Sequence, residues 1–163
     1  MKGLALSGGG IKAAAHIGAL KAFEEENIKF DSVSGASSGS IIATMYALGY
    51  SSDEMWKLFK KNFKKIRYAE WKQIIKMILG LIVTRRIIID GLNSGKIIEK
   101  IIDEICLKKS IYNINEIEMP LLISMVDLQN GTVYIASSKE NRGSLLDNTK
   151  YISDMPIGKA VRA

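Results

Sequence analysis

The sequence predicts an α/β fold in which parallel strands are joined by crossover helices. Two observations lead to this prediction: the first 49 residues alternate short apolar runs with helical stretches, and each apolar run ends in a glycine turn. This alternation is typical of parallel sheets, because parallel strands need a long crossover connection. The length of 163 residues is enough for one domain with a single core.

The first part of the chain predicts two strand–helix units. In order, they are a strand at 3–6, a helix at 11–26, a strand at 28–34 and a helix at 40–48. Gly49 fits the end of the second helix. Three glutamates, at residues 24–26, lie at the carboxyl end of the first helix. Because the helix dipole disfavours negative charge there, they predict a small local cost.

The rest of the chain predicts further helices and a hairpin. Ser51 and Glu54 form a capping-box pattern, which predicts that a helix follows. An amphipathic helix is expected at 94–106, with five isoleucines on one face. Apolar runs at 121–127 and 132–136 flank Asn130-Gly131, a strong hairpin signal. Residues 156–163 read as the first two turns of a final helix.

Composition sets bounds on redox chemistry and location. Cys106 is the one cysteine, so no intramolecular disulfide forms, and its surroundings predict a small buried residue on a helix. No cysteine or histidine pattern has metal-ligand spacing, so neither a metal nor a cofactor is expected. The start of the chain does not fit a signal peptide, and no run of 18 apolar residues is present. The expected location is the cytoplasm, with peripheral binding to the membrane.

The pattern Gly35-Ala36-Ser37-Ser38-Gly39 lies between an expected strand and an expected helix. A nucleophilic serine must project from the sheet, and a tight strand-to-helix turn with flanking glycines achieves this. The amides at the start of the next helix favour negative charge at the same place. Ser37 is therefore the candidate nucleophile. The alternative is an ordinary tight turn in which the serine caps the helix.

A second glycine-rich turn contains Gly8, Gly9 and Gly10, followed by Lys12. Acyl transfer passes through a tetrahedral oxyanion, and backbone N–H groups aimed at that oxygen stabilise it by several kcal/mol. A glycine run at a helix N-terminus allows such an approach, and Lys12 adds positive charge. The alternative is a phosphate-binding loop.

A catalytic histidine is not evident. His16, the one histidine of the chain, lies about 9 Å along the helix axis from the glycine turn, at about 1.5 Å per residue. It is expected to be a partly buried structural residue. Either the general base lies beyond Ala163, or the chemistry needs no histidine.

Three stretches carry a resemblance to a known family. They are Gly8-Gly9-Gly10-Ile11-Lys12-Ala13, His16-Ile17-Gly18-Ala19-Leu20 and Gly35-Ala36-Ser37-Ser38-Gly39-Ser40. In this order they resemble the start of a bacterial patatin-like phospholipase. Further similar segments are Asp90-Gly91-Leu92, Val126-Asp127-Leu128 with Gly131, and Ile157 to Ala163. The resemblance therefore spans essentially the whole chain.

The resemblance implies a three-layer α/β sandwich with a mainly parallel central sheet flanked by helices. It also implies a carboxylic ester hydrolase of the phospholipase A or lysophospholipase type, acting on phospholipids or related acyl lipids through a Ser-Asp dyad. Ser37 would be the nucleophile. The glycine turn would supply the oxyanion amides, with Lys12, Gly35 and Gly39 in support.

Two departures from the family pattern matter. Ala13 stands where the family usually has glycine, a change that is expected to be tolerated. The family's catalytic aspartate lies in an Asp-Gly-Gly or Asp-Gly-Ala motif, and this chain contains neither. Asp90 precedes Gly91-Leu92, and Asp127 matches a different family position. Residues 1–163 are therefore expected to form an incomplete patatin-like phospholipase domain whose base lies beyond residue 163, with little activity of its own.

A basic stretch rich in aromatic residues runs from residue 56 to residue 86, with ten lysines or arginines and one acid. Such a segment suits an anionic membrane surface. The aromatic residues expected to contact lipid are Trp56, Phe59, Phe63 and Trp71. The alternative is a solvated helical pair that covers the sheet. No nucleic-acid recognition motif is present, so nucleic acid is not an expected partner.

Two other functions stay open from the sequence. One is a catalytically inert relative that binds membranes or regulates, which the missing aspartate motif suggests. The other is a dinucleotide-binding domain, because Gly8, Gly10 and Ala13 loosely fit that fingerprint. The dinucleotide reading needs an acidic residue at the end of the second strand, and Asp31 comes too early for it.

Overall fold

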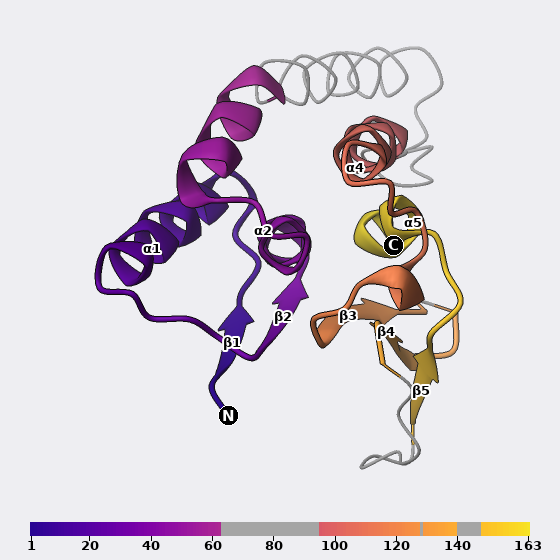
Figure 1. Cartoon of the computed structure of the whole chain (residues 1–163). Helices are drawn as coiled ribbons and strands as arrows, with labels where there is room; N and C mark the ends of the chain where they lie inside the picture. Colours follow the sequence, from indigo (N-terminus) through magenta and orange to yellow (C-terminus); the bar gives the residue numbers. More distant parts are fainter. Residues whose placement is uncertain (63–94, 128, 140–147) are drawn as a thin grey trace, which may run out of the picture.

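Five strands form one mixed sheet whose order follows the chain (Figure 1). The computed structural model describes residues 1–62, 95–127, 129–139 and 148–163. Within them the strands are β1 (Gly3–Leu6), β2 (Ser32–Ala36), β3 (Leu121–Val126), β4 (Val133–Ser137) and β5 (Thr149–Ile152). Only the β3–β4 pairing is antiparallel, and the other three pairings are parallel. The predicted α/β fold with a mainly parallel sheet is confirmed.

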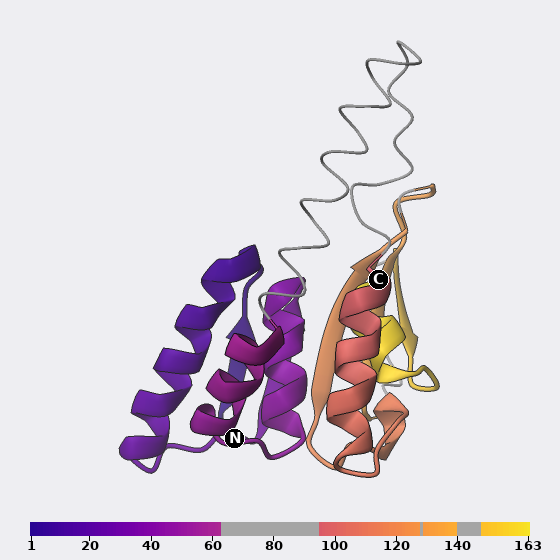
Figure 2. The same ribbon diagram turned by 90° about the horizontal axis from the view of Figure 1, so that it is seen from above.

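Helices flank this sheet, close to the predicted positions. They are η1 (Gly10–Ala13), α1 (Ala14–Glu25), α2 (Ser38–Ala47), a helix over 52–62, α4 (Lys96–Leu107), η2 (Ile114–Glu116) and α5 (Ile157–Arg162). Figures 1 and 2 place α1 and α2 beside β1 and β2, and α4 and α5 beside β3. None of the helices among the described residues is long and apolar enough to span a membrane.

The buried side chains of the strands point to the side on which α2 and α5 pack. In β3, Leu121, Ile123 and Met125 are buried, whereas Ser124 and Val126 are exposed. This alternation is the two-residue period of a strand with one covered face. The helices that cover this face come from both halves of the chain, and together they position the candidate site.

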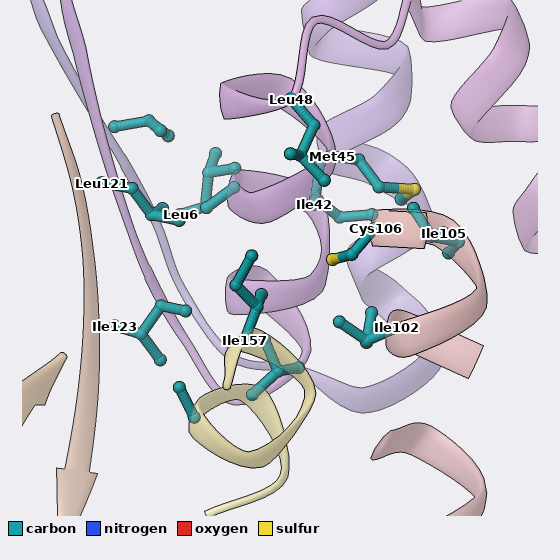
Figure 3. Close-up of a cluster of buried hydrophobic side chains, with 14 of the residues drawn as sticks. Leu6, Ile42, Met45, Leu48, Ile102, Ile105, Cys106, Leu121, Ile123 and Ile157 are labelled. Atoms are coloured by element: carbon teal, nitrogen blue, oxygen red, sulfur yellow. The ribbon is translucent and has the colours of Figure 1, made fainter. Parts of the chain in front are cut away.

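The core under α2 and α4 is aliphatic. Figure 3 shows Ile42 and Met45 of α2 beside Ile102, Ile105 and Cys106 of α4. Burying each large side chain of this kind contributes roughly 1.5–3 kcal/mol, so these residues add to the core that α2 and α4 share. The expectation that Cys106 is a small buried residue on a helix is confirmed, because the residue is 1% exposed.

The capping box at Ser51 is confirmed. The Ser51 amide donates to the Glu54 carboxylate at 2.9 Å, and the Glu54 amide donates to the Ser51 hydroxyl at 3.3 Å. These two bonds satisfy amides at the start of the helix over 52–62, which would otherwise lack partners.

Glu24 lies in the last turn of α1, as predicted, but it also has a partner that the sequence did not suggest. Its carboxylate accepts hydrogen bonds from the Ser52 amide at 2.8 Å and from the Ser52 hydroxyl. Ser52 begins the next helix, so the charge of Glu24 faces the favourable, positive end of that helix. The contact with Ser52 therefore offsets the local cost that was predicted for Glu24 at the end of α1.

The second strand begins later than predicted. Residues 28–31 lie outside β2, and Phe30 instead packs edge-on against Phe23 and Tyr46, with ring centroids 5.1 Å and 6.2 Å away. The apolar alternation therefore reflected an aromatic cluster before the strand. β5 was not predicted at all.

The predicted hairpin is confirmed between β3 and β4. The Asp127 amide donates to the Thr132 carbonyl at 2.9 Å, and the Gly131 amide donates to the Asp127 carbonyl at 2.8 Å. Gly131 has a φ of 70°, a conformation that glycine adopts without cost.

Candidate active site

Ser37 occupies a sharp bend between β2 and α2. Its backbone has φ 50° and ψ −128°, which L-residues other than glycine rarely adopt. A strained serine at a strand-to-helix turn is the geometry of a nucleophile elbow. Ser37 is exposed, and its hydroxyl has no hydrogen-bond partner among the described residues. The structure therefore places Ser37 at an exposed turn between a strand and a helix.

The glycines on either side of Ser37 allow its turn to pack tightly. A Cβ atom on Gly35 would lie 2.6 Å from the Gly39 carbonyl oxygen. A Cβ atom on Gly39 would lie 2.6 Å from the Ser7 carbonyl oxygen, and closer still to that of Leu6. Both distances are too short for real atoms, so only glycine fits. This explains in structural terms why the motif needs glycine at both positions.

The glycine turn after β1 lies against Ser37. β1 and β2 are parallel neighbours, so the turns that follow them meet at the same edge of the sheet. A Cβ atom on Gly8 would lie 3.0 Å from the Ser37 Cβ atom. The Gly9 amide donates to the Ser38 hydroxyl at 3.1 Å. The two motifs that the sequence singled out are thus brought together and linked by a hydrogen bond.

A large apolar pocket opens beside Ser37. Its volume is about 980 Å³, which is at the upper end for sites that hold small ligands. Both halves of the chain line it, through α2, the helix over 52–62, β3, α4 and α5. The polar residues of the lining include Ser37, Ser38, Ser40, Asn62 and Ser124. Ser37 therefore borders a space that suits an apolar molecule.

No acid–base partner for Ser37 is evident in the part of the chain that the structure describes. No aspartate, glutamate or histidine is among the described residues that line the pocket. The Nε2–H of His16 donates to the Ser7 carbonyl at 2.9 Å, which gives this half-buried residue a structural role. Lys12 is exposed.

The shifted pKa values also lie away from the pocket. Burial, with a smaller effect of Asp103, raises the pKa of Cys106 to about 12. Burial raises the pKa of Asp103 too, with help from Glu99. Neither side chain lines the pocket, and no group of three metal-ligating side chains occurs within the described ranges.

The aromatic residues predicted to contact lipid are described only in part. Trp56 is 42% exposed and stacks on Phe59, with ring centroids 5.8 Å apart and planes 7° apart. Phe59 also lines the pocket, and the Lys60 ammonium lies 5.4 Å from the Trp56 ring centroid. Phe63 and Trp71 lie outside the described residues, as does Asp90-Gly91-Leu92.

Asp31 is far from the place that dinucleotide binding requires. Its carboxylate accepts a hydrogen bond from the Lys2 amide. Lys2 precedes β1, so Asp31 lies at the amino end of the strands, whereas the glycine turn follows their carboxyl ends. An acid that binds ribose would have to lie at the carboxyl edge.

Comparison with known proteins decides the family. The family model described as "Patatin-like phospholipase" matches residues 4–163. The chain belongs to the patatin-like phospholipase family.

Relatives of this patatin-like chain occur in bacteria and fungi. YqhO of Bacillus subtilis is 31% identical over 159 residues, which are 96% of this chain and 52% of YqhO. Lysophospholipase NTE1 of Kluyveromyces lactis is 39% identical over 59 residues, which are 36% of this chain and 4% of that protein. The chain thus spans about half the length of YqhO.

A solved structure supports the patatin-like fold. A chain of the heterodimeric ExoU–SpcU complex from the type III secretion system of Pseudomonas aeruginosa matches with a TM-score of 0.57 and 21% identity. The match covers 99% of this chain and 35% of that chain. At this identity the likeness bears on the fold alone.

The isoleucines of α4 are functional candidates that the sequence reasoning missed. Ile98, Ile101, Ile102 and Ile105 line the pocket beside Ser37. Their spacing predicted a helix with an apolar face. It did not indicate that this face would border the candidate nucleophile Ser37, which comes more than 60 residues earlier, because that contact depends on how the sheet is assembled.

Proposed function

We propose that this patatin-like domain takes part in hydrolysis of ester bonds in phospholipids or related acyl lipids, with Ser37 as the nucleophile. The observation that carries the proposal is the strained, exposed Ser37 at the mouth of a large apolar pocket. An apolar space beside a nucleophile suits the acyl side of a lipid ester. Family membership supports the same class of reaction.

The proposed reaction has two halves. In the first, the Ser37 oxygen attacks the ester carbonyl carbon while its proton passes to a general base. The oxyanion collapses, the alcohol leaves with that proton, and the acyl group stays on Ser37. In the second, water attacks the acyl-serine, the base takes one of its protons, and the fatty acid leaves as Ser37 is protonated again.

The oxyanion would accept hydrogen bonds from the turn of Gly8, Gly9 and Gly10. Gly9 and Gly10 line the pocket together with Ser37, which supports this role. The Gly9 amide already donates to Ser38, so the oxyanion would take that amide in exchange for the serine hydroxyl. Removing one such donor typically slows an enzyme about 100- to 1,000-fold. Lys12, which follows in η1, would add positive potential.

The base is proposed to be an aspartate, as in the family's Ser-Asp dyad. The family places this residue in an Asp-Gly-Gly or Asp-Gly-Ala motif, and the 163 residues contain neither. Residues 1–163 would therefore supply the nucleophile and the oxyanion turn, and the carboxylate would come from a longer chain.

We further propose that the surface around Trp56 contacts an anionic membrane. Trp56 is exposed, and its neighbours on the helix over 52–62 include Lys57, Lys60 and Lys61. An exposed aromatic residue can insert into the membrane interface, and each basic residue near the surface strengthens binding to anionic lipid by about 1 kcal/mol. Phe59 links this surface to the pocket.

Lipid hydrolysis by a full-length protein tests the proposed function. We expect release of fatty acid from lysophosphatidylcholine, and loss of that release in Ser37→Ala. Ser34→Ala is the matched control, because Ser34 lies on β2, the strand that leads into Ser37, but does not line the pocket. If the folded full-length protein binds lipid vesicles but releases no fatty acid from any acyl lipid tested, the inert membrane-binding relative is the correct reading.

A further inference from the structure

We propose that the pocket beside Ser37 holds one long acyl chain, and that the isoleucines of α4 limit the length of that chain. This inference rests on the proposed function of Ser37. It adds the part of the substrate that is recognised and the residues that select it.

The exposed fractions of the lining residues distinguish the mouth of the pocket from its base. At the mouth, Ser37 is exposed, and Ile11 and Val126 are 57% and 54% exposed. Deeper in the lining, Met45 and Ile105 are 2% and 3% exposed. An acyl group on Ser37 would therefore extend from solvent into a closed, apolar end.

Two helices give this space its length. Met45 follows Ser37 by eight residues in the α2 segment, which is about 12 Å along the axis at 1.5 Å per residue. On α4, Ile98, Ile101 and Ile105 follow one face of the helix at helical spacing. Figure 3 shows Met45 and Ile105 on the facing sides of the two helices. The pocket is thus a slot between α2 and α4 that ends near these two side chains.

The lining contains little charge. Among the described lining residues, Arg162 is the one with a charged side chain, and it is exposed and paired with Glu99 at 2.6 Å. Among the described residues in the depth of the slot, a phosphate-bearing headgroup would find no cationic partner, whereas methylene groups gain free energy there. The chemistry therefore selects the acyl chain for the pocket and leaves the headgroup at the mouth.

Binding of saturated fatty acids to the Ser37→Ala protein tests this inference without hydrolysis. We expect the affinity, measured by displacement of a fluorescent fatty acid, to rise about fourfold for each methylene from octanoate onward. The rise should stop when the chain reaches the base of the slot. A fatty acid affinity that is independent of chain length would overturn the proposal.

Substitutions on α4 test which of its residues limit the length of the bound acyl chain. Ile101→Phe narrows the slot, so it should weaken palmitate binding about tenfold or more while octanoate binding changes less than about twofold. Ile97→Phe is the matched control, because Ile97 lies one turn earlier on α4, is 39% exposed and does not line the pocket. Ile101→Ala should move the preference to longer chains.

Several results would contradict the role of α4. Equal ratios of palmitate affinity to octanoate affinity in folded Ile101→Phe and Ile97→Phe would overturn it. If circular dichroism shows that Ile101→Phe is unfolded, Ile98→Phe at a half-buried position and Ile101→Ala decide in its place. Loss of hydrolysis in the separate lipid assay, with the chain-length dependence intact, would sink only the proposed function.

Discussion

Ser37 holds a conformation that costs free energy, and its neighbours explain how it persists. Non-glycine residues at positive φ typically cost about 1–3 kcal/mol and persist only where the surrounding structure enforces them. Here Gly39 brings the turn against the carbonyls of Leu6 and Ser7, and Gly35 packs against the backbone of Gly39 and Ser40. The Ser40 hydroxyl also donates to the Ser37 carbonyl. The strain at the serine is thus maintained by contacts on both sides.

Gly39→Ala should destabilise the fold, because the new methyl group would overlap backbone atoms of Leu6 and Ser7. We expect the free energy of unfolding to fall by about 2 kcal/mol or more in urea titrations. Gly18→Ala is the control. Gly18 lies within α1 with no atom near its potential Cβ, so alanine should stabilise by about 0.5–1 kcal/mol. Equal effects of the two substitutions would contradict the account of the elbow.

Cys106 should resist thiol reagents in the folded protein. Burial and the neighbouring Asp103 raise the pKa of its thiol to about 12, so little reactive thiolate exists at pH 8. We expect no alkylation by iodoacetamide until the protein is unfolded in guanidinium, as read by mass spectrometry. Rapid alkylation of the native protein would show that the α2–α4 contact opens readily.

The raised pKa of the Cys106 thiol also predicts that the folded protein loses stability at high pH. Its pKa is raised by folding, so its contribution is fully present below the unfolded pKa of about 8.5 and is lost as pH rises toward about 12. The slope should approach about 1.4 kcal/mol per pH unit. Cys106→Ala removes this group, so its stability should fall less steeply over that range in parallel urea titrations. Identical slopes would contradict the raised pKa.

At the scale of elements, contacts between helices organise the first half of the molecule. Glu24 of α1 accepts both hydrogen bonds from Ser52, at the start of the helix over 52–62. That helix carries Leu58, Phe59 and Asn62 into the pocket lining. α1 therefore fixes the position of one wall of the candidate site without touching it.

Glu24→Ala should loosen this wall. We expect a loss of about 1–2 kcal/mol in the free energy of unfolding, because the start of the helix over 52–62 loses a charged cap. Glu26→Ala is the matched control, since Glu26 is an exposed glutamate two residues away whose carboxylate makes no hydrogen bond to any residue that the structure describes. Equal losses in the two variants would show that the Ser52 contact contributes little.

The elements that sequence reasoning predicted best are those with strong local signals. The hairpin followed from Asn130-Gly131, and the capping box from Ser51 and Glu54. Two elements were missed or displaced for physical reasons. β5 is only four residues long, and its partner β4 supplies the context that makes it a strand. The apolar alternation at residues 28–31 includes Phe30, which packs in an aromatic cluster with Phe23 and Tyr46 and not in a strand.

At the scale of the whole molecule, the candidate site is assembled from distant segments. The sequence predicted Ser37 and the glycine turn, because each motif is local and the order of strands implies that they meet. It did not predict the pocket. α4 and β3 reach Ser37 only through the pairing of β2 with β3, which joins residues almost 90 positions apart. Such pairing has no local signature.

Labelling with a fluorophosphonate probe tests the central claim most directly, because the probe bonds covalently to an activated serine oxygen. In a full-length protein, we predict a single adduct on Ser37, located by mass spectrometry, which is absent in Ser37→Ala and retained in Ser34→Ala. An adduct on another serine, or no adduct on a folded protein that hydrolyses lipid esters, would contradict the assignment of Ser37 as the nucleophile.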